Sequence, residues 1–163
     1  MRRGYLGLGS NVGDRHAHLR AARDRLAATR GVRLLAASSV YETEPQAGAG
    51  GQGDFLNACL AIETSLAPEA LLGACKEVER ALGRPPGGRH HAPRPIDVDV
   101  LLLDGVEHGS EELTLPHPDL PHRRFVLEPL LELDPALALP DGTPLASPLA
   151  ALEGQRVERL GPL

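Results

Sequence analysis

The sequence predicts an α+β protein: a ferredoxin-like β-α-β-β-α-β sandwich with an antiparallel sheet and a C-terminal extension. Three observations lead to this fold class. Four short runs read as strands, and two segments between them carry apolar residues at helical spacing. A glycine-rich stretch over residues 46–54 joins the second and third strands, which favours a hairpin. The prolines and the turn that come after the last strand indicate an extension of the same domain.

The first strand is predicted over residues 4–9 and leads through a glycine-rich turn into a helix over about 14–29. The apolar face of this helix consists of Leu19, Ala22 and Leu26. The turn has neither the G-x-G-x-x-G spacing nor the G-K-[ST] ending of nucleotide-binding loops, so a structural turn is favoured. A second strand is predicted over residues 32–43.

The third strand, residues 55–65, places Phe55 and Asn57 on one face. An aromatic ring beside an amide suits a flat heteroaromatic ligand, because the ring can stack while the amide pairs with ring nitrogens. The alternative is a core phenylalanine beside an exposed asparagine. A second helix begins at Pro68, a favourable first position, and ends before Gly83, a typical residue just past a helix.

The fourth strand begins near Ile96 and contains Asp97 and Asp99 on one face, about 6–7 Å apart at Cα. Two like charges on one strand face repel each other. A bound Mg²⁺ would offset that cost, because it takes carboxylate and phosphate oxygens as ligands. The alternative is a pair of solvated aspartates with no role. Arginine and histidine clusters at residues 84–94 and 117–124 flank the strand, and they favour a metal and polyphosphate site.

The whole chain of 163 residues is predicted to be one domain, and the extension is expected to include a short helix across residues 124–133. A net charge of −5 argues against a protein that coats nucleic acid. No run has the length of a signal peptide's apolar region or of a membrane span, and we expect a cytoplasmic protein. Cys59 and Cys75 lie apart within apolar patterns and are predicted to be buried thiols.

Six motifs occur in order along nearly the whole chain, and together they are highly specific. They are Gly9-Ser10-Asn11, Tyr41-x-Thr43-x-Pro45, Asp54-Phe55-Leu56-Asn57, Gly83-Arg84, Pro93-Arg94-Pro95-Ile96-Asp97-Val98-Asp99, and Pro116-His117 with Arg123-x-Phe125. The sequence thereby resembles the 6-hydroxymethyl-7,8-dihydropterin pyrophosphokinase family of folate biosynthesis. The resemblance implies transfer of pyrophosphate from ATP to the hydroxymethyl oxygen of the pterin, with release of AMP.

The resemblance also implies roles for individual residues. Asp97 and Asp99 would hold two Mg²⁺ ions. The ATP phosphates would contact Arg84, Arg94, His117 and Arg123, with Arg84 and Arg94 supporting the transition state. Positions near the adenosine would be Glu79 and Thr114. The pterin would lie between Phe55 and Phe125 and contact Thr43, Pro45 and Asn57. One departure is His91, which stands where a relative carries tryptophan.

The partners expected from this resemblance are the small molecules ATP and 6-hydroxymethyl-7,8-dihydropterin. No binding of nucleic acid or of a membrane is expected, and the chain is expected to be a monomer. Two other classes of function remain open at this point. One is a nucleotidyltransferase of the palm type, which also carries carboxylates on such a sheet but needs a basic track for nucleic acid. The other is a non-catalytic domain of this fold that senses a small molecule.

Overall fold

The computed structural model describes residues 1–43, 54–83, 95–152 and 154–163. In chain order the elements are β1 (Arg2–Ser10), α1 (Arg15–Ala27), β2 (Val32–Ala37), β3 (Ser39–Thr43), β4 (Phe55–Thr64), α2 (Pro68–Ala81), β5 (Asp97–Leu103), β6 (His108–Gly109), β7 (Thr114–Leu115), a 3-10 turn (Leu120–His122), α3 (Arg124–Leu133), α4 (Ala146–Leu149) and β8 (Val157–Pro162). The predicted combination of helices with an antiparallel sheet is therefore confirmed.

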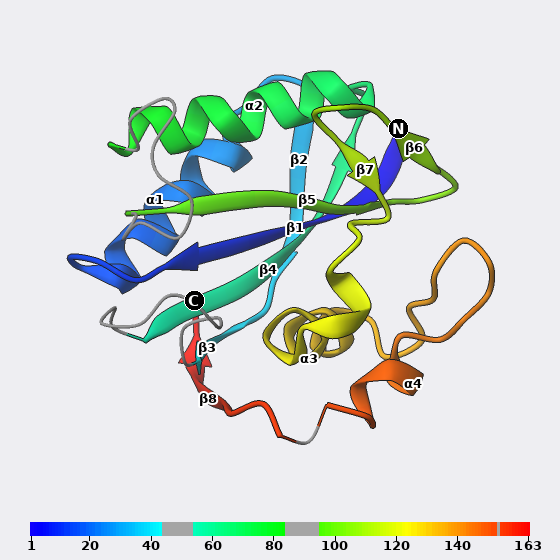
Figure 1. The fold of residues 1–163 in the computed structure, drawn as a ribbon. Coiled ribbons are helices and arrows are strands. Elements are labelled where there is room, and N and C mark those ends of the chain that lie inside the picture. The colour runs from blue at the N-terminus through cyan, green and yellow to red at the C-terminus, as the bar shows by residue number, and fades with distance from the viewer. Residues whose placement is uncertain (44–53, 84–94, 153) are drawn as a thin grey trace.

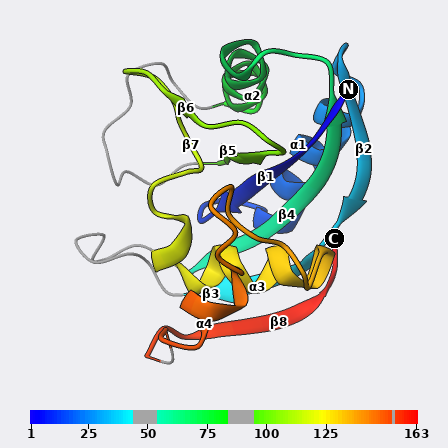
Figure 2. The same ribbon diagram turned by 90° about the vertical axis from the view of Figure 1, so that its right-hand side faces the viewer.

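The main sheet of the described chain has the order β5-β1-β4-β3-β8, and β2 pairs with β4 beside β3. Every pairing in this sheet is antiparallel. Figures 1 and 2 show three layers. Helices α1 and α2 cover one face of the sheet, while α3 and the C-terminal segment lie against the other. A separate small hairpin, β6 and β7, lies next to β5.

The helix ends follow local chemistry. The side chain of Asp14 accepts a hydrogen bond from the backbone N–H of Ala17, which satisfies one of the free donors at the start of α1. Pro68 occupies the first turn of α2, where no backbone N–H is needed. Gly83 follows α2 with φ +103°, and its N–H donates to the Arg80 carbonyl. Both predicted boundaries of α2 are confirmed.

The sheet has an apolar cluster on each face. Toward α1 and α2 the cluster includes Leu6, Leu8, Leu60, Ile62, Val98 and Val100. Toward α3 it includes Cys59, Ala61, Leu101, Leu127, Leu130 and Leu145. Alternate residues of one strand thus serve opposite layers, and burying both sets stabilises the sheet. Both cysteines are buried as predicted, and burial raises the pKa of the Cys75 thiol to about 12.

The predicted single strand over residues 32–43 is wrong in one respect, because the structure divides it into β2 and β3. The break lies at Ser38, which still meets β4 through a hydrogen bond from its N–H to the Cys59 carbonyl. The Ser38 hydroxyl accepts from the Cys59 N–H and donates to the Ser39 carbonyl. A serine side chain replaces a backbone partner here, and this competition is how serine interrupts regular pairing.

The C-terminal segment is more regular than the sequence indicates. Its last strand, β8, pairs along β3 and so adds an outer strand to the main sheet. The Leu163 carbonyl accepts a hydrogen bond from Arg23 of α1, which ties the end of the chain to the first helix. No helix in the described segments is long and apolar enough to cross a membrane.

A carboxylate on α3 fixes this helix to β3. Glu132 accepts hydrogen bonds from the Ser39 N–H, the Ser39 hydroxyl and the Tyr41 hydroxyl, at 2.9, 3.0 and 2.6 Å. Burial alone would raise the pKa of Glu132, but these hydrogen bonds outweigh it and hold the pKa below its ordinary value of 4.5. Burial and the same carboxylate raise the pKa of Tyr41, so its hydroxyl remains a donor at neutral pH.

We expect this cluster to stabilise the fold at neutral pH and to lose its effect in acid. Because the pKa of Glu132 is lower in the folded chain, its contribution is fully present above the unfolded value and disappears as the pH falls through the folded value. Urea unfolding at pH 7 should show Glu132→Gln less stable than wild type by about 1–3 kcal/mol. At pH 3 the difference should shrink, and an equal difference at both pH values would contradict the assignment.

Candidate active site

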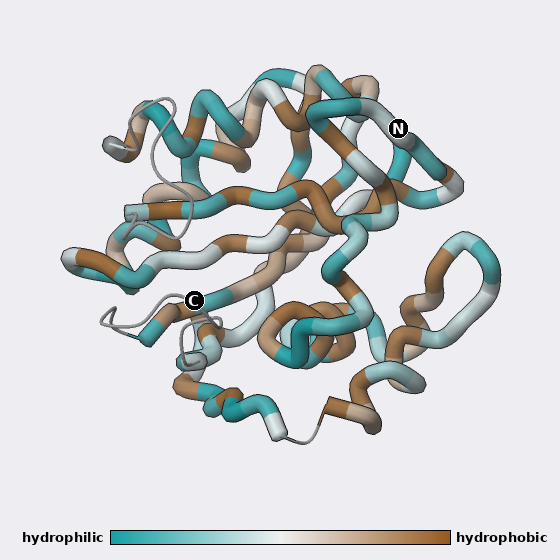
Figure 3. The backbone as a smooth tube through the Cα atoms, in the orientation of Figure 1, coloured by the Kyte–Doolittle hydropathy of each residue, from teal (hydrophilic) through white to brown (hydrophobic). Residues whose placement is uncertain are grey.

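The exposed end of β5 carries the two predicted metal-binding aspartates. Val98 and Val100 are buried toward α2, so Asp97 and Asp99 lie on the opposite face, the one that α3 covers farther along the strand. Figure 3 shows this pattern as alternation between hydrophilic and hydrophobic residues along β5, followed by a continuous hydrophobic run. Asp99 is exposed and Asp97 is half-buried. The shared face predicted from sequence is therefore present.

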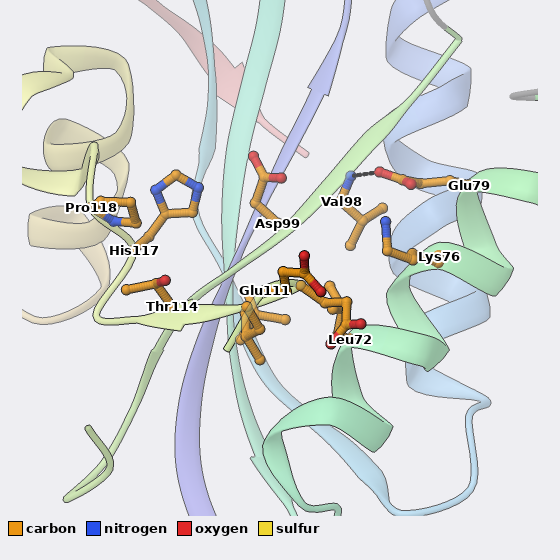
Figure 4. Close-up of a pocket in the computed structure, with 12 residues that line it drawn as sticks. Leu72, Lys76, Glu79, Val98, Asp99, Glu111, Thr114, His117 and Pro118 are labelled. Atoms are coloured by element: carbon orange, nitrogen blue, oxygen red, sulfur yellow. Dashed lines mark hydrogen bonds between the residues drawn. The ribbon is translucent and has the colours of Figure 1, made fainter. Parts of the chain in front are cut away.

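Helix α2 holds this end of β5 in place through Glu79. Strand β5 is at the edge of the sheet, so one side of its backbone has no neighbouring strand in the described structure. The buried Glu79 carboxylate accepts a hydrogen bond from the Val98 N–H at 2.8 Å, as Figure 4 shows. A backbone donor that would otherwise need water is thereby satisfied. The bond also fixes the residue between the two aspartates.

A pocket of about 340 Å³ opens beside Asp99, between α2, β5 and the segment around β7. Figure 4 shows the side chains of Lys76, Glu79, Asp99, Thr114 and His117 around it. Its described lining carries the carboxylates Glu79, Asp99, Glu111 and Glu112, against Lys76 and His117 as basic groups. The described lining is therefore acidic on balance. Such a lining repels a polyphosphate unless cations enter with it.

A second group of predicted residues lies across the sheet from the aspartates. In the strand register, Asp97 of β5 is opposite Gly9 of β1, and Gly9 is opposite Asn57 of β4. The Asn57 amide donates to the Thr43 hydroxyl at 2.8 Å, and both residues are buried. Residues directly opposite one another point to the same face, so the aspartates and this amide share one surface of the sheet.

Gly9 forms the floor between the two groups. A Cβ at this position would lie 3.2 Å from Asn57 Oδ1 and 3.6 Å from the Phe55 ring. We expect Gly9→Ala to weaken binding of the expected pterin by about tenfold, since a ligand against this floor would meet the methyl group, and overpacking typically costs about 1–3 kcal/mol. Gly73→Ala is the control, because apart from its own helix backbone and chain neighbours no described atom lies within 4 Å of its Cβ position. Titration with pterin in the presence of an ATP analogue measures both variants, and equal affinities would contradict this role for Gly9.

His117, Arg123 and Phe125 lie in the segment that leads into α3. The His117 N–H donates to the Leu101 carbonyl at 2.9 Å, which joins this segment to β5. Arg123 pairs with Asp119 at 3.0 Å, and its guanidinium lies 5.6 Å from the centre of the Phe125 ring. The Phe125 ring packs at the edge of the apolar cluster under α3. Arg123 and Phe125 are thus held together as one unit.

The structure brings most of the predicted site residues into two groups, one at the pocket and one on the sheet face of Asp97 and Asp99. Glu79, Asp99, Thr114 and His117 line the pocket, while Phe55 and Asn57, which bonds Thr43, lie beside Gly9 on the sheet face that carries Asp97. Pro45, Arg84, Arg94 and His91 lie outside the described residues. Within the described residues no group of three or more His, Cys, Asp or Glu side chains could hold a metal ion, so Asp97 and Asp99 are a pair of carboxylates without a third such side chain.

Sequence reasoning missed three charged residues of the pocket, Lys76, Glu111 and Glu112. Lys76 had a usable signal, because it is three residues before Glu79 on the same helix and therefore shares its face. The two glutamates had no such signal. They come from the irregular chain between β6 and β7, whose path depends on tertiary packing.

Comparison with known proteins gives a consistent result. The sequence model of the family described as 7,8-dihydro-6-hydroxymethylpterin-pyrophosphokinase matches residues 5–135. A 2-amino-4-hydroxy-6-hydroxymethyldihydropteridine pyrophosphokinase of Methylorubrum extorquens is 46% identical over 160 residues, which are 98% of this chain and 99% of that protein. The enzyme of the same name from Bacillus subtilis is 42% identical over 129 residues, which are 79% of this chain and 76% of that protein.

Solved structures agree at the level of the fold. A structure titled HPPK-DHPS in complex with substrates has a TM-score of 0.71 at 12% identity, over 92% of this chain and 43% of that chain. The wild-type HPPK-DHPS of Plasmodium falciparum has a TM-score of 0.69 at 12% identity, over 92% of this chain and 41% of that chain. This chain thus spans less than half of these longer proteins. With the family model and the relatives of similar length, the resemblance seen in the motifs is confirmed, and the chain belongs to the 7,8-dihydro-6-hydroxymethylpterin-pyrophosphokinase family.

Proposed function

We propose that this chain is the pyrophosphokinase of folate biosynthesis that transfers the terminal two phosphates of ATP to the hydroxymethyl oxygen of 6-hydroxymethyl-7,8-dihydropterin. The family and the names of its relatives support this activity. The observation that carries it is the position of Asp97 and Asp99. They lie between a nucleotide-sized pocket on one side and the paired Asn57 and Thr43 on the other.

In the proposed reaction the pterin oxygen bonds to the β-phosphorus of ATP. The bond between that phosphorus and the oxygen bridging to the α-phosphate breaks, and AMP leaves with this oxygen. The hydroxyl proton passes to solvent, and no side chain is assigned as a base, since a loose phosphoryl transition state needs little help from one. The chief task of the protein is to hold the two substrates in line.

The residues of the β5 end fit a magnesium site. Asp97 and Asp99 offer hard oxygen donors on one face, and Mg²⁺ usually binds one or two carboxylates together with substrate phosphates and water. Bound there, two Mg²⁺ ions would neutralise phosphate charge and align the attacking and leaving oxygens. The acidic lining of the described pocket supports the same conclusion, because it provides little positive charge of its own.

The roles of the other site residues form part of the proposal. On the nucleotide side, Glu79 and Thr114 would lie near the adenosine, and His117 and Arg123 would contact phosphates together with Arg84 and Arg94. On the pterin side, Asn57 and Thr43 would pair with the ring nitrogens, and Pro45 would adjoin them. Phe55 and Phe125 would enclose the ring, which suits the stacking of a flat heterocycle.

We extend the proposal to the organisation of the chain. The order β5-β1-β4, with β2 and β3 together as the outer neighbour, is the order of a ferredoxin-like sheet if these two short strands count as one. Residues 1–163 would form one pyrophosphokinase domain that acts in the cytoplasm as a monomer. The alternative of a palm-type nucleotidyltransferase is disfavoured, since the described pocket is acidic where a nucleic-acid track would be basic.

The test is release of AMP from Mg-ATP with and without 6-hydroxymethyl-7,8-dihydropterin. We expect AMP to appear only when the pterin is present and to stop when a chelator removes the metal. Binding of both ligands without AMP release would leave a sensing domain as the better description. Release of AMP without the pterin would point to simple ATP hydrolysis and would contradict the proposed acceptor.

A further inference from the structure

We infer that Glu132, which lies outside the proposed site, is a positioning residue for the pterin half of that site. Its carboxylate holds α3, which carries Phe125, against β3, which carries Thr43. The inference rests on the proposed function and adds to it a residue that touches neither substrate. Its effect should therefore appear in pterin binding and leave ATP binding unchanged.

The first step is the geometry of β3. Alternate residues of a strand share a face, so Ser39, Tyr41 and Thr43 point to the same side of the sheet. Ser39 and Tyr41 donate their hydrogen bonds to Glu132, and Thr43 accepts one from Asn57. Anchoring the first two residues of this row therefore fixes the third.

The second step is the register between β3 and β4. Tyr41 lies directly opposite Asn57, and Thr43 lies opposite Phe55. A shift of Tyr41 along or away from the sheet would be transmitted to the proposed pterin-binding residues on both strands. Tyr41 is itself only 5% exposed, and its hydroxyl lies 2.6 Å from the Glu132 carboxylate. This short bond to a charged acceptor is among the stronger types of hydrogen bond.

The third step concerns α3. Phe125 and Glu132 are seven residues apart, about two helical turns, so they lie near the same stripe of the helix. Pro129 lies within α3 and has no N–H to donate to the carbonyl of Phe125, four residues earlier. The first turn of α3, which contains Phe125, therefore lacks one of the backbone hydrogen bonds that would stabilise it. The place of the Phe125 ring depends on how α3 is fixed to the sheet.

Hydrogen bonds fix α3 at both ends, and at its start Arg124 donates to Gln155 of the C-terminal segment through its N–H and its guanidinium, at 2.8 and 2.9 Å. Near the start, the Cys59 thiol donates to the Val126 carbonyl at 3.9 Å, which is a weak bond. Near the end, Glu132 receives three donors, and Arg159 of β8 lies 3.9 Å from the carboxylate while it donates to the Ser39 hydroxyl. Among the described hydrogen bonds between α3 and the main sheet, those of Glu132 are thus the stronger, and their loss should let the helix shift relative to β3.

Glutamine at position 132 gives a selective test. It keeps the shape of glutamate, but its single oxygen cannot accept all three hydrogen bonds, and its NH₂ group would face donors. A matched control exists one helical turn earlier. Glu128→Gln makes the same change of charge on the same helix, and Glu128 pairs only with Arg124 of α3 among the described residues.

The experiment measures the KM of both substrates by AMP release, together with thermal unfolding of each variant. For Glu132→Gln we expect the pterin KM to rise by about tenfold, because weaker hydrogen bonds to β3 let the pterin-binding residues shift. The KM for ATP should stay within a factor of about two. Glu128→Gln should leave both constants near wild type, even if its melting temperature falls. Equilibrium titration with pterin and an unreactive ATP analogue gives the same comparison without turnover.

Tyr41→Phe is a milder variant in case Glu132→Gln fails to fold. It removes one hydroxyl, and we expect a smaller rise in the pterin KM. In the double variant the two effects should not add, because they break the same bond. Unchanged pterin KM in Tyr41→Phe and in any folded Glu132→Gln overturns the positioning role while the proposed function stands. If the wild type releases no AMP with pterin, both proposals are overturned.

Discussion

Replacing Asp97 or Asp99 by alanine is expected to lower kcat/KM by at least about a thousandfold, since metal stabilisation of transferring phosphates is worth several kcal/mol and each 1.36 kcal/mol is a factor of ten. The fold should survive, because Asp99 is exposed and β5 is held by its buried valines and by Glu79. The measurement is pterin-dependent AMP release over a range of Mg²⁺ concentrations.

Asp104→Ala is the matched control for this experiment. Asp104 is exposed just beyond the other end of β5, so replacing it changes the net charge equally and leaves Asp97 and Asp99 in place. Its rate should stay near that of wild type. Thermal unfolding should also show Asp99→Ala no less stable than wild type, since one of two repelling charges is gone. Near-normal turnover in either aspartate variant would contradict the assignment of Asp97 and Asp99 as metal ligands.

Asn57→Leu is expected to lower kcat/KM for the pterin by about a thousandfold, because a site built to hydrogen-bond its ligand loses large factors when that partner is removed. Leucine has a similar volume but offers no donor or acceptor. It would also leave the Thr43 hydroxyl without the 2.8 Å bond from the Asn57 amide. The measurement is the KM of each substrate, and the loss should fall on the pterin.

A second variant separates the two partners of this pair. Thr43→Val keeps the shape of threonine and removes only the hydroxyl that accepts from Asn57. We expect it to raise the pterin KM by about tenfold or less, in the range of one hydrogen bond of about 1 kcal/mol. If ATP binding suffers as much as pterin binding in either variant, Asn57 belongs to the nucleotide side and the proposed division of the site is wrong.

The sequence allowed most of the helices and strands to be predicted because their patterns are local. Pro68 and Gly83 bound α2 as expected, and the alternation around Asp97 and Asp99 correctly placed both on one face. Residues 55–65 matched β4 to within one position. In each of these segments the periodicity, the end residues and the burial all indicate the same element, and such agreement makes prediction reliable.

Features that depend on distant partners could not be predicted in this way. The break at Ser38 arises because its side chain bonds β4, and nothing in the neighbouring residues reveals that contact. Strand β8 pairs with the edge of β3, which is more than 110 positions earlier in the chain. The composition of residues 157–162 alone therefore did not indicate a strand. Glu132 looked like an ordinary helix residue, and its partners lie more than 90 positions earlier in the chain.

Lys76 is the only lysine in the sequence, and its side chain lies at the pocket beside Asp99. Apart from the amino terminus, the chain therefore offers a single primary amine, and this amine is where the nucleotide is expected to bind. A nucleotide analogue that carries an amine-reactive group would have one lysine to attach to, so a single modified peptide would identify the site. Covalent inhibitors that target lysine could likewise reach this pocket without a competing lysine elsewhere in the sequence.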